Sequence, residues 1–405
     1  MKVLHLLITL LALSSFLFSA DEALDTYISD TKKDKFKYEY EKNEAESSKL
    51  RDSWISPLNL NYTYSKSNPF DNKQTQESAG IKMDQKIFQS GGIYYSIKYA
   101  NASKKYNAYT IDVSKRKLVK DAISTLMQIK QASLKLEKQN LQIDNSQISL
   151  EQKKEQYLNG RLDSGFLNNA IIETNLVKQA LYDIETNQQK LISTFKSISD
   201  RDYKTSYIPK LEIISLEDFL RYNIVLDMSK SEIEKNGYFK DVTVSKYLPV
   251  LNVTAGYNWQ KSKNQSFSSN VVFAPQETTY YNYGFKVNMP LNINTFVDVE
   301  SSKVDYLKSK VNVIDKRREL TAIYEQVMQN IENLDKKKQL SIENEDLYES
   351  LLIDTTEQFK AGYKTSYDVE LLQNSVNIQK LNIKIYEIDK QLELLTLYEM
   401  YKHEI

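Results

Sequence analysis

Residues 85–95 read QKIFQSGGIYY, and the two glycines separate two different patterns. Before them, polar and apolar residues alternate, which is typical of a strand. After them, neither glycine nor proline occurs until Gly160, and a second run without either extends from Pro290 to Gly362. Because a helix rises about 1.5 Å per residue, each run would form a rod of roughly 100 Å. The sequence therefore predicts short strands that turn abruptly into very long helices.

A similar turn follows each predicted rod. Residues 157–168 read YLNGRLDSGFLN and residues 359–370 read FKAGYKTSYDVE, with glycine and serine at matching positions. The first strands of the two halves also resemble each other. We interpret the chain as a tandem duplication, in which each copy runs helix, two strands, long helix, turn and helix. The predicted repeats are residues 21–202 and 203–405.

Composition excludes several classes of function. Among the 405 residues, lysine plus arginine and aspartate plus glutamate both number 54, so no global positive field favours nucleic acid. Cysteine is absent, and the histidines are His5 and His403. A thiol nucleophile, a thiolate metal site or a serine–histidine triad would need residues that this chain lacks. We therefore expect no cofactor, no metal site and no catalytic site, and an enzyme is the least favoured class.

The first twenty residues have the layout of a secretory signal peptide. Lys2 begins a short positive region, an apolar segment runs from Val3 to Phe18, and Ala20 precedes an acidic pair. The apolar segment is shorter than the roughly 20 residues that a spanning helix needs. We expect residues 1–20 to be removed after export; a membrane anchor is the alternative.

Four segments between residues 55–90 and 248–292 alternate polar and apolar side chains with a period of two. One interpretation is a half-buried sheet of a soluble domain. The other is a membrane β-barrel, whose strands place apolar side chains toward lipid and polar ones toward the lumen. Tyrosines and both tryptophans cluster at these segments, as the aromatic girdles of a barrel require, so we favour the barrel. The predicted lumen-lining residues are Asn59, Asn61, Asn252, Asn258 and Lys286.

Four strands are too few to close a membrane barrel, because such barrels need about eight or more. An open edge in lipid would leave backbone groups without partners. Three chains would supply twelve strands, so the strand count predicts a homotrimer embedded in lipid.

Apolar residues recur every seven positions along the predicted helices. The first rod carries two such stripes, one through Ile129 and Ile143 and another through Met127 and Ile148. Two stripes on one helix predict two helical neighbours, as in a wall of coiled coils, whereas a single solvated coiled coil needs only one.

These features together resemble the TolC-like outer-membrane channel family of Gram-negative bacteria. The resemblance rests on the duplicated helix–strand–strand–helix order, on IFQSGG at 87–92 and on the turns YLNGRLDS and FKAGYKTSYDV. It implies a mainly α protein: a trimeric channel with four strands per protomer in a twelve-stranded membrane β-barrel, continued by a long coiled-coil α-barrel through the periplasm. Gly91 and Gly92 would then form the corner between strand and helical wall, because glycine tolerates backbone angles that other residues avoid.

The resemblance also implies roles for the two turns. In the family, the corresponding helical tips form the periplasmic gate and the docking site for an adaptor. The residues that fall on these tips are Gly160, Asp163, Ser164, Gly362, Lys364, Ser366 and Asp368. Asp368 falls on an acidic position that forms a ring at the closed end, although a carboxylate at the start of a helix is also favoured by the helix dipole.

The function that we expect from these features is passive export. The protein would be the outer-membrane channel of a tripartite efflux or type I secretion system, working with a periplasmic adaptor (membrane fusion protein) and an inner-membrane transporter. The alternative is a periplasmic coiled-coil adaptor or scaffold without a pore, which would leave the four alternating strands unexplained. The sequence does not identify the exported cargo.

Overall fold

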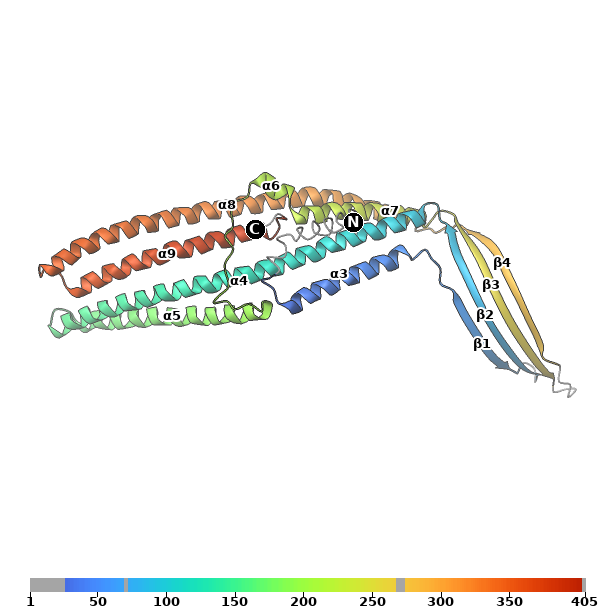
Figure 1. Cartoon of the computed structure of the whole chain (residues 1–405), viewed down its shortest axis with the longest axis horizontal. Coiled ribbons are helices and arrows are strands. Elements are labelled where there is room, and N and C mark those ends of the chain that lie inside the picture. Colours follow the sequence, from blue (N-terminus) through green and yellow to red (C-terminus); the bar gives the residue numbers. More distant parts are fainter. Residues whose placement is uncertain (1–25, 69–71, 267–273, 403–405) are drawn as a thin grey trace, which may run out of the picture. The chain divides into compact units, whose positions relative to one another are not determined.

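The computed structural model describes residues 26–68, 72–266 and 274–402 (Figure 1). The predicted signal peptide and both histidines lie outside these ranges. The chain divides into two compact units. Unit 1 comprises Met1–Tyr38, Ile111–Val225 and Arg317–Ile405, and unit 2 comprises Glu39–Thr110 and Leu226–Lys316. Each unit therefore combines segments from both predicted repeats.

The same order of elements occurs twice along the chain, with a short helix between the two occurrences. The first is α3 (Asp30–Arg51), β1 (Asn59–Ser67), β2 (Asn72–Phe88), α4 (Gly92–Leu158) and α5 (Ser164–Ile198). After α6 (Leu216–Arg221), the second is α7 (Ile224–Ser245), β3 (Val250–Ser266), β4 (Gln276–Asn288), α8 (Thr295–Lys360) and α9 (Ser366–Tyr398). Helices α4 and α8 contain 67 and 66 residues, so the predicted rods are confirmed.

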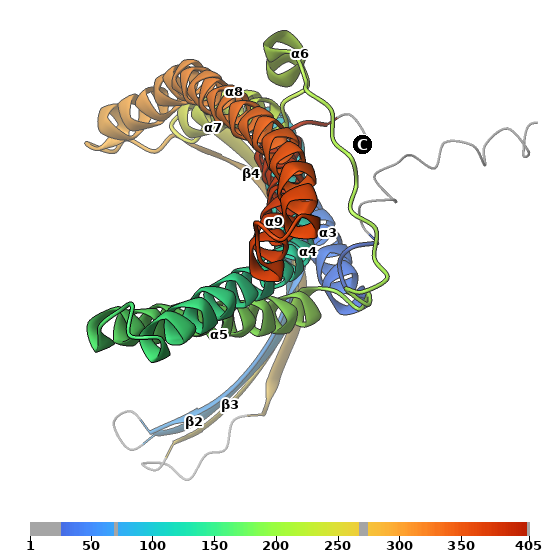
Figure 2. The ribbon, with the colours of Figure 1, turned by 90° about the vertical axis from the view of Figure 1, so that its left-hand side faces the viewer.

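Unit 1 contains a layer of four helices in the order α5, α4, α9, α8 (Figure 2). Polar contacts connect each helix to the next, so that α4 and α9 both have a neighbour on either side. These contacts are Gln139 Nε2 to Val177 O at 2.8 Å, Asn374 Nδ2 to Asn145 Oδ1 at 2.8 Å, and Lys390 Nζ to Asp335 Oδ2 at 2.9 Å.

Burial along α4 follows the two predicted stripes. Ile129 and Ile143 of one stripe are buried, as are Met127 and Ile148 of the other, whereas Tyr157 at the end of the helix is exposed. Both stripes are therefore covered within a single chain, which agrees with two helical neighbours for α4. Fully buried side chains of unit 1 come from five helices and include Leu126 of α4, Phe195 of α5, Phe219 of α6, Leu320 of α8 and Leu394 of α9.

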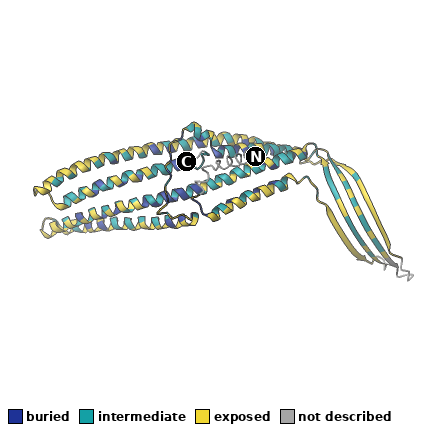
Figure 3. Cartoon of the chain, in the orientation of Figure 1, coloured by how far each residue is buried: buried dark blue, intermediate teal, exposed yellow. Residues whose placement is uncertain are grey.

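Unit 2 contains a four-stranded antiparallel sheet in the order β1-β2-β3-β4 and the adjoining parts of four helices. Asn43 of α3 donates to the carbonyl of Lys104 in α4 at 2.9 Å, and the rings of Tyr99 in α4 and Phe239 in α7 lie 5.4 Å apart. In contrast to the helices, the described strands have side chains that are exposed or of intermediate burial (Figure 3). Among the described residues, neither face of the sheet is therefore covered.

The corner between β2 and α4 depends on three consecutive residues. Ser90 and Gly91 have positive φ angles of 44° and 85°, and the Ser90 hydroxyl donates to the carbonyl of Pro249 at 3.0 Å. Gly92 has no positive φ, so the prediction that both glycines serve unusual backbone angles is wrong for this residue. A Cβ on Gly92 would lie 2.6 Å from the Ser245 Oγ, and Ser245 is itself buried. The same Cβ would lie 2.8 Å from the Gln89 side chain, so Gly92 is needed for close packing against Ser245 of α7 and Gln89, not for its φ angle.

We predict that Gly92→Ala destabilises the protein by about 1–3 kcal/mol, the usual cost of overpacking a filled site. Because the Ser245 hydroxyl is the nearest obstacle, Ser245→Ala should recover part of this loss in the double variant. Gly284→Ala is the matched control, since its Cβ would meet its nearest neighbour at 3.8 Å. Thermal unfolding of the four proteins measures the effect. Equal stability of Gly92→Ala and Gly284→Ala would contradict the close-approach role.

Candidate functional site

The strands place all five predicted lumen-lining residues on one face of the sheet. Residues directly opposite each other in an antiparallel pair point to the same side. Asn61 lies opposite Gly80, which lies opposite Asn258; Asn252 lies opposite Lys286. Asn59 is two residues from Asn61 and therefore shares its face. A Cβ on Gly80 would meet the Oδ1 atoms of Asn258 and Asn61 at 3.0 and 3.1 Å, so the asparagines converge over this glycine.

The opposite face of the sheet is apolar and exposed. Phe285 is 84% exposed, Tyr283 81% and Leu60 73%. A contiguous exposed surface of this kind is rare on soluble monomers and marks contact with protein or membrane. The residues of this apolar face include Leu60, Tyr62, Tyr64, Ile81, Val253, Tyr257, Trp259, Tyr281, Tyr283, Phe285 and Val287.

The end of the polar face that adjoins the helices is basic. Lys86, Asn252 and Lys286 form one row across β2, β3 and β4, and Lys82 lies two rows away on the same face. Asp84 lies between the two rows on the same face and contributes one negative charge. This part of the polar face therefore combines three lysines with one carboxylate.

The predicted tips are two turns in unit 1 that end α4 and α8 in the same way. Gly160 and Gly362 have positive φ angles of 68° and 80°. After the first, Arg161 N donates to Gln156 O at 2.9 Å; after the second, Tyr363 N donates to Gln358 O at 2.8 Å. This is the Schellman ending, which needs a left-handed residue at the glycine position. Both glycines therefore terminate their helices for the same physical reason.

The helices that follow the tips begin differently. Asp163 is the N-cap of α5, and its Oδ1 accepts from Gly165 N at 2.7 Å. Thr365 is the N-cap of α9 and forms a capping box with Asp368. The Asp368 Oδ2 accepts from the Thr365 backbone N–H at 2.9 Å and from its hydroxyl at 2.8 Å. Ser164 and Ser366 are the first residues of α5 and α9.

Hydrogen bonds lower the pKa of Asp368. The backbone N–H of Thr365 contributes most, its hydroxyl contributes next, and the neighbouring Lys364 ammonium adds a smaller attraction. The structure thus brings Lys364, Thr365 and Asp368 together at one helix start. Thr365 was not among the predicted site residues, although its spacing from Asp368 matches a capping box and could have identified it. The cap occupies one carboxylate oxygen of Asp368, Oδ2.

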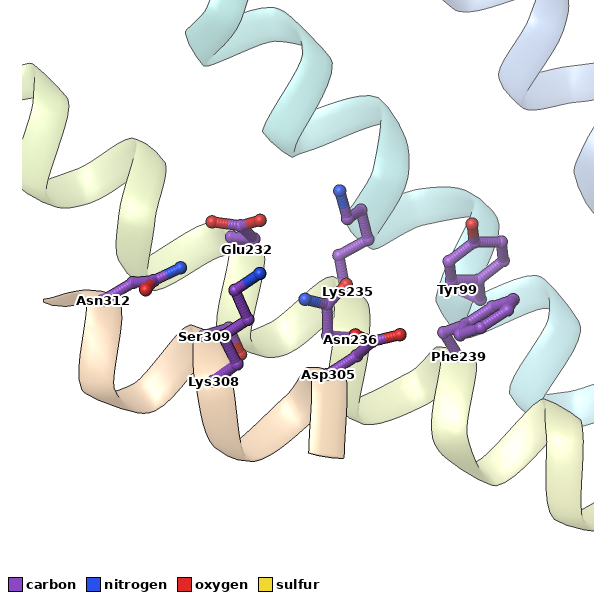
Figure 4. Close-up of a pocket in the computed structure, with 9 residues that line it drawn as sticks. All are labelled: Tyr99, Glu232, Lys235, Asn236, Phe239, Asp305, Lys308, Ser309 and Asn312. Atoms are coloured by element: carbon purple, nitrogen blue, oxygen red, sulfur yellow. The ribbon is translucent and has the colours of Figure 1, made fainter. Parts of the chain in front are cut away.

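A cavity of about 310 Å³ lies among α4, α7 and α8 within unit 2 (Figure 4). Tyr99 and Phe239 line one end, and the charged residues are Glu232, Lys235, Asp305 and Lys308. Burial lowers the pKa of Lys235, whose ammonium lies 3.7 Å from the ring centroid of Tyr106. Two acids and two bases balance each other, so the lining favours neither an anion nor a cation. We assign no function to this cavity.

The described residues hold no group of three or more histidine, aspartate or glutamate side chains suited to a metal ion. In the same part of the chain, no helix is both apolar and long enough to cross a bilayer.

Several solved structures with the same fold are outer-membrane proteins. The Campylobacter jejuni CmeC outer membrane channel matches with a TM-score of 0.71 and 11% identity, over 95% of this chain and 87% of its own. The Vibrio cholerae outer membrane protein VceC matches with a TM-score of 0.67 and 12% identity, over 90% and 92%. The open state of the Neisseria gonorrhoeae MtrE outer membrane channel gives 0.63 and 11%, over 93% and 87%.

No family sequence model and no curated protein sequence matches the chain. The likeness is therefore one of fold, and it extends over nearly the whole length of both partners. The chain has the fold of the outer-membrane channels, as the resemblance in its sequence predicted.

We predict that Thr365→Ala loosens the first turn of α9 by about 1 kcal/mol, the typical value of an N-cap. Asp368→Asn should retain most of this stability, because its amide oxygen still accepts the Thr365 hydrogen bonds. Amide hydrogen exchange of the first turn of α9 measures both effects. Protection of the first turn of α5, capped by Asp163, serves as the internal control. Unchanged exchange in Thr365→Ala would show that the cap contributes nothing to the tip.

The same cap predicts a pH dependence. Because the folded pKa of Asp368 is lowered, its contribution is fully present above the ordinary carboxyl pKa of about 3.9 and is lost as the pH falls through the lower folded value. On acidification the protection factor of this turn, that is, exchange relative to the intrinsic rate at the same pH, is therefore expected to fall in the wild type and not in Asp368→Asn. An identical acid response of the two proteins would exclude Asp368 as the titrating group.

Proposed function

We propose that this protein is an outer-membrane channel, a passive conduit for export from a Gram-negative cell. The observation that carries the proposal is the sheet, which has an exposed apolar face with tyrosine and tryptophan side chains and a polar face lined with asparagines. A membrane barrel needs this arrangement, with lipid on one side and water on the other. The shared fold with the CmeC and MtrE channels supports the same conclusion.

The proposed assembly is a homotrimer. Strands β1 and β4 are the two ends of the strand order, and unpaired strand edges are costly in lipid. The outer helices of the unit 1 layer also bear exposed apolar residues, such as Leu176 on α5 and Leu347 on α8. In unit 2, α8 exposes Val297, Val304 and Val311 at intervals of seven residues. Neighbouring copies would pair the edges and cover these residues.

The tips are the proposed gate and adaptor-docking site. Both turns belong to unit 1, both have the same Schellman ending, and their side chains are largely exposed, with Tyr363 at 83% and Phe166 at 54%. Exposed aromatic residues on a turn are suited to binding a protein partner. The proposed partners are a periplasmic adaptor and, through it, an inner-membrane transporter that supplies the energy. No catalytic role is proposed.

Extraction from membranes separates this proposal from a periplasmic scaffold without a pore. We expect the protein to remain in the outer-membrane fraction after washes with high salt and to dissolve only in detergent. The apolar face requires a hydrophobic environment, whereas screening by salt weakens only charged contacts. Reconstitution into planar bilayers should then give ion conductance. Release by salt, together with the absence of conductance, would favour the scaffold.

A second measurement tests Asp368 as part of the gate. Three copies of this carboxylate around a narrow lumen would attract divalent cations, so added cations should block the current from the tip side. Asp368→Asn, which keeps the cap, should weaken the block roughly tenfold. Glu370→Gln is the control, because it removes an exposed charge two residues further along α9, outside the capping box. Equal loss of block in the two variants would mean that general charge, not Asp368, attracts the cation.

A further inference from the structure

Three lysines gather at the end of the sheet that is remote from the helices. Lys66 of β1, Lys73 of β2 and Lys263 of β3 are exposed and line a cavity of about 500 Å³. The register places Lys66 opposite Thr75 and Thr75 opposite Lys263, so that two lysines flank one threonine in the same row. Lys73 lies two residues from Thr75 and points to the same side. We call Lys66, Lys73 and Lys263 the lysine cluster.

The lysine cluster lies on the apolar face of the sheet. Thr75 shares its face with Ala79 and Ile81, because strand residues at even spacing point to the same side. An apolar groove of about 430 Å³ occupies this face, and its lining includes Tyr62, Ala79 and Trp259. The small Ala79 side chain leaves the groove open between two large aromatic ones. We call this the aromatic groove.

The lysine cluster and the aromatic groove follow one another along β2. From Ala79 to Thr75 the strand advances roughly 13 Å, at about 3.3 Å per residue. Glu77 lies between them and is opposite Tyr64 on one side and Lys261 on the other. Lys261 also lies 4.0 Å from Glu277, which accepts from the Trp259 indole at 2.7 Å. Among the described residues of this face, the carboxylates Glu77 and Glu277 both lie in the Lys261 row, and the lysine cluster lies beyond that row.

An apolar groove followed along the strand by a cluster of positive charges matches one class of ligand. A membrane lipid carries apolar chains next to a polar head, and an anionic lipid adds a phosphate at the boundary. Aromatic side chains favour that boundary, and lysines beyond it attract phosphates. A free anion would use the lysine cluster and leave the aromatic groove empty.

We propose that the aromatic groove and the lysine cluster together bind a phosphate-bearing anionic lipid on the outside of the barrel, at the boundary remote from the helices. The inference rests on the proposed function, since it requires the apolar face to contact lipid. The acyl chain lies between Tyr62 and Trp259 over Ala79, and the phosphate lies among Lys66, Lys73 and Lys263.

Lipid retention by the detergent-solubilised, full-length protein tests the proposal. The probes are phosphatidic acid and phosphatidylcholine, counted as bound adducts by native mass spectrometry. The test variant is Lys66→Gln/Lys73→Gln/Lys263→Gln. The matched control is Lys82→Gln/Lys86→Gln/Lys286→Gln, which removes the same number of lysines from the polar face of the same sheet. A fourth variant, Ala79→Phe, fills the aromatic groove without changing charge.

We expect the wild type to prefer phosphatidic acid by about a hundredfold, since each lysine near a lipid phosphate contributes about fivefold. The preference should survive in the control and disappear in the lysine-cluster variant. Ala79→Phe should reduce retention of both lipids. Inorganic phosphate at equal concentration should displace little lipid, because it does not fill the aromatic groove.

Two results would overturn the inference. Equal loss of preference in the two lysine variants would show non-specific attraction by charge. Full displacement by inorganic phosphate, with Ala79→Phe behaving like the wild type, would show a free-anion site. Wild-type conductance in phosphatidylcholine bilayers tests the proposed function separately. A protein that conducts but shows no lipid preference refutes only the lipid-binding inference. A protein that needs no detergent and does not conduct refutes the proposed function and the lipid-binding inference.

Discussion

The backbone hydrogen bonds of a strand edge are the constraint on which the rest of this structure depends. A four-stranded sheet has two edges, and in a bilayer each unpaired group on an edge costs several kcal/mol. Here the sheet also leaves its apolar face exposed, so burial within the chain does not stabilise it. Under the proposed function, both problems are solved by the same event, the joining of three copies around one lumen. In the proposed assembly, neighbouring copies would also cover the exposed valines of α8 and the exposed leucines of the outer helices.

The parts of the fold that follow from local periodicity could be predicted from the sequence. The absence of glycine and proline after Gly92 predicts α4, and a period of two predicts which face of β3 carries Asn252 and Asn258. The reason for Gly92 could not be predicted in this way. It depends on the Ser245 hydroxyl, which belongs to a helix from the other half of the chain. The positive φ of Ser90 could not be predicted either, because serine rarely adopts a positive φ and no local sequence pattern indicates one here.

The candidate site could be predicted less well than the fold, and the two tips show why. The sequence predicts Gly160 and Gly362 as a matched pair, because the Schellman ending demands a left-handed residue at the same point of each turn. The start of the next helix can be capped by several residue types that stabilise it to a similar degree. The first tip uses the carboxylate of Asp163, whereas the second uses the hydroxyl of Thr365 and returns a bond from Asp368. Matching by sequence position therefore pairs Asp163 with Thr365, and the role of each carboxylate has to be read from its hydrogen bonds.

Net charge hides the electrostatics of this chain. The formal charge is zero, which argues against a protein that attracts nucleic acid over its whole surface. The period of two nevertheless sorts lysines onto opposite faces of the sheet: Lys82, Lys86 and Lys286 on the polar face near the helices, and Lys66, Lys73 and Lys263 on the apolar face at the far end. Screening limits each group to a range of about 10 Å, so these two fields act independently. In the proposed barrel, the lysines of the polar face act on solutes in the lumen, and the lysines of the apolar face act on lipid outside. A shift of strand register by one residue would exchange the two faces.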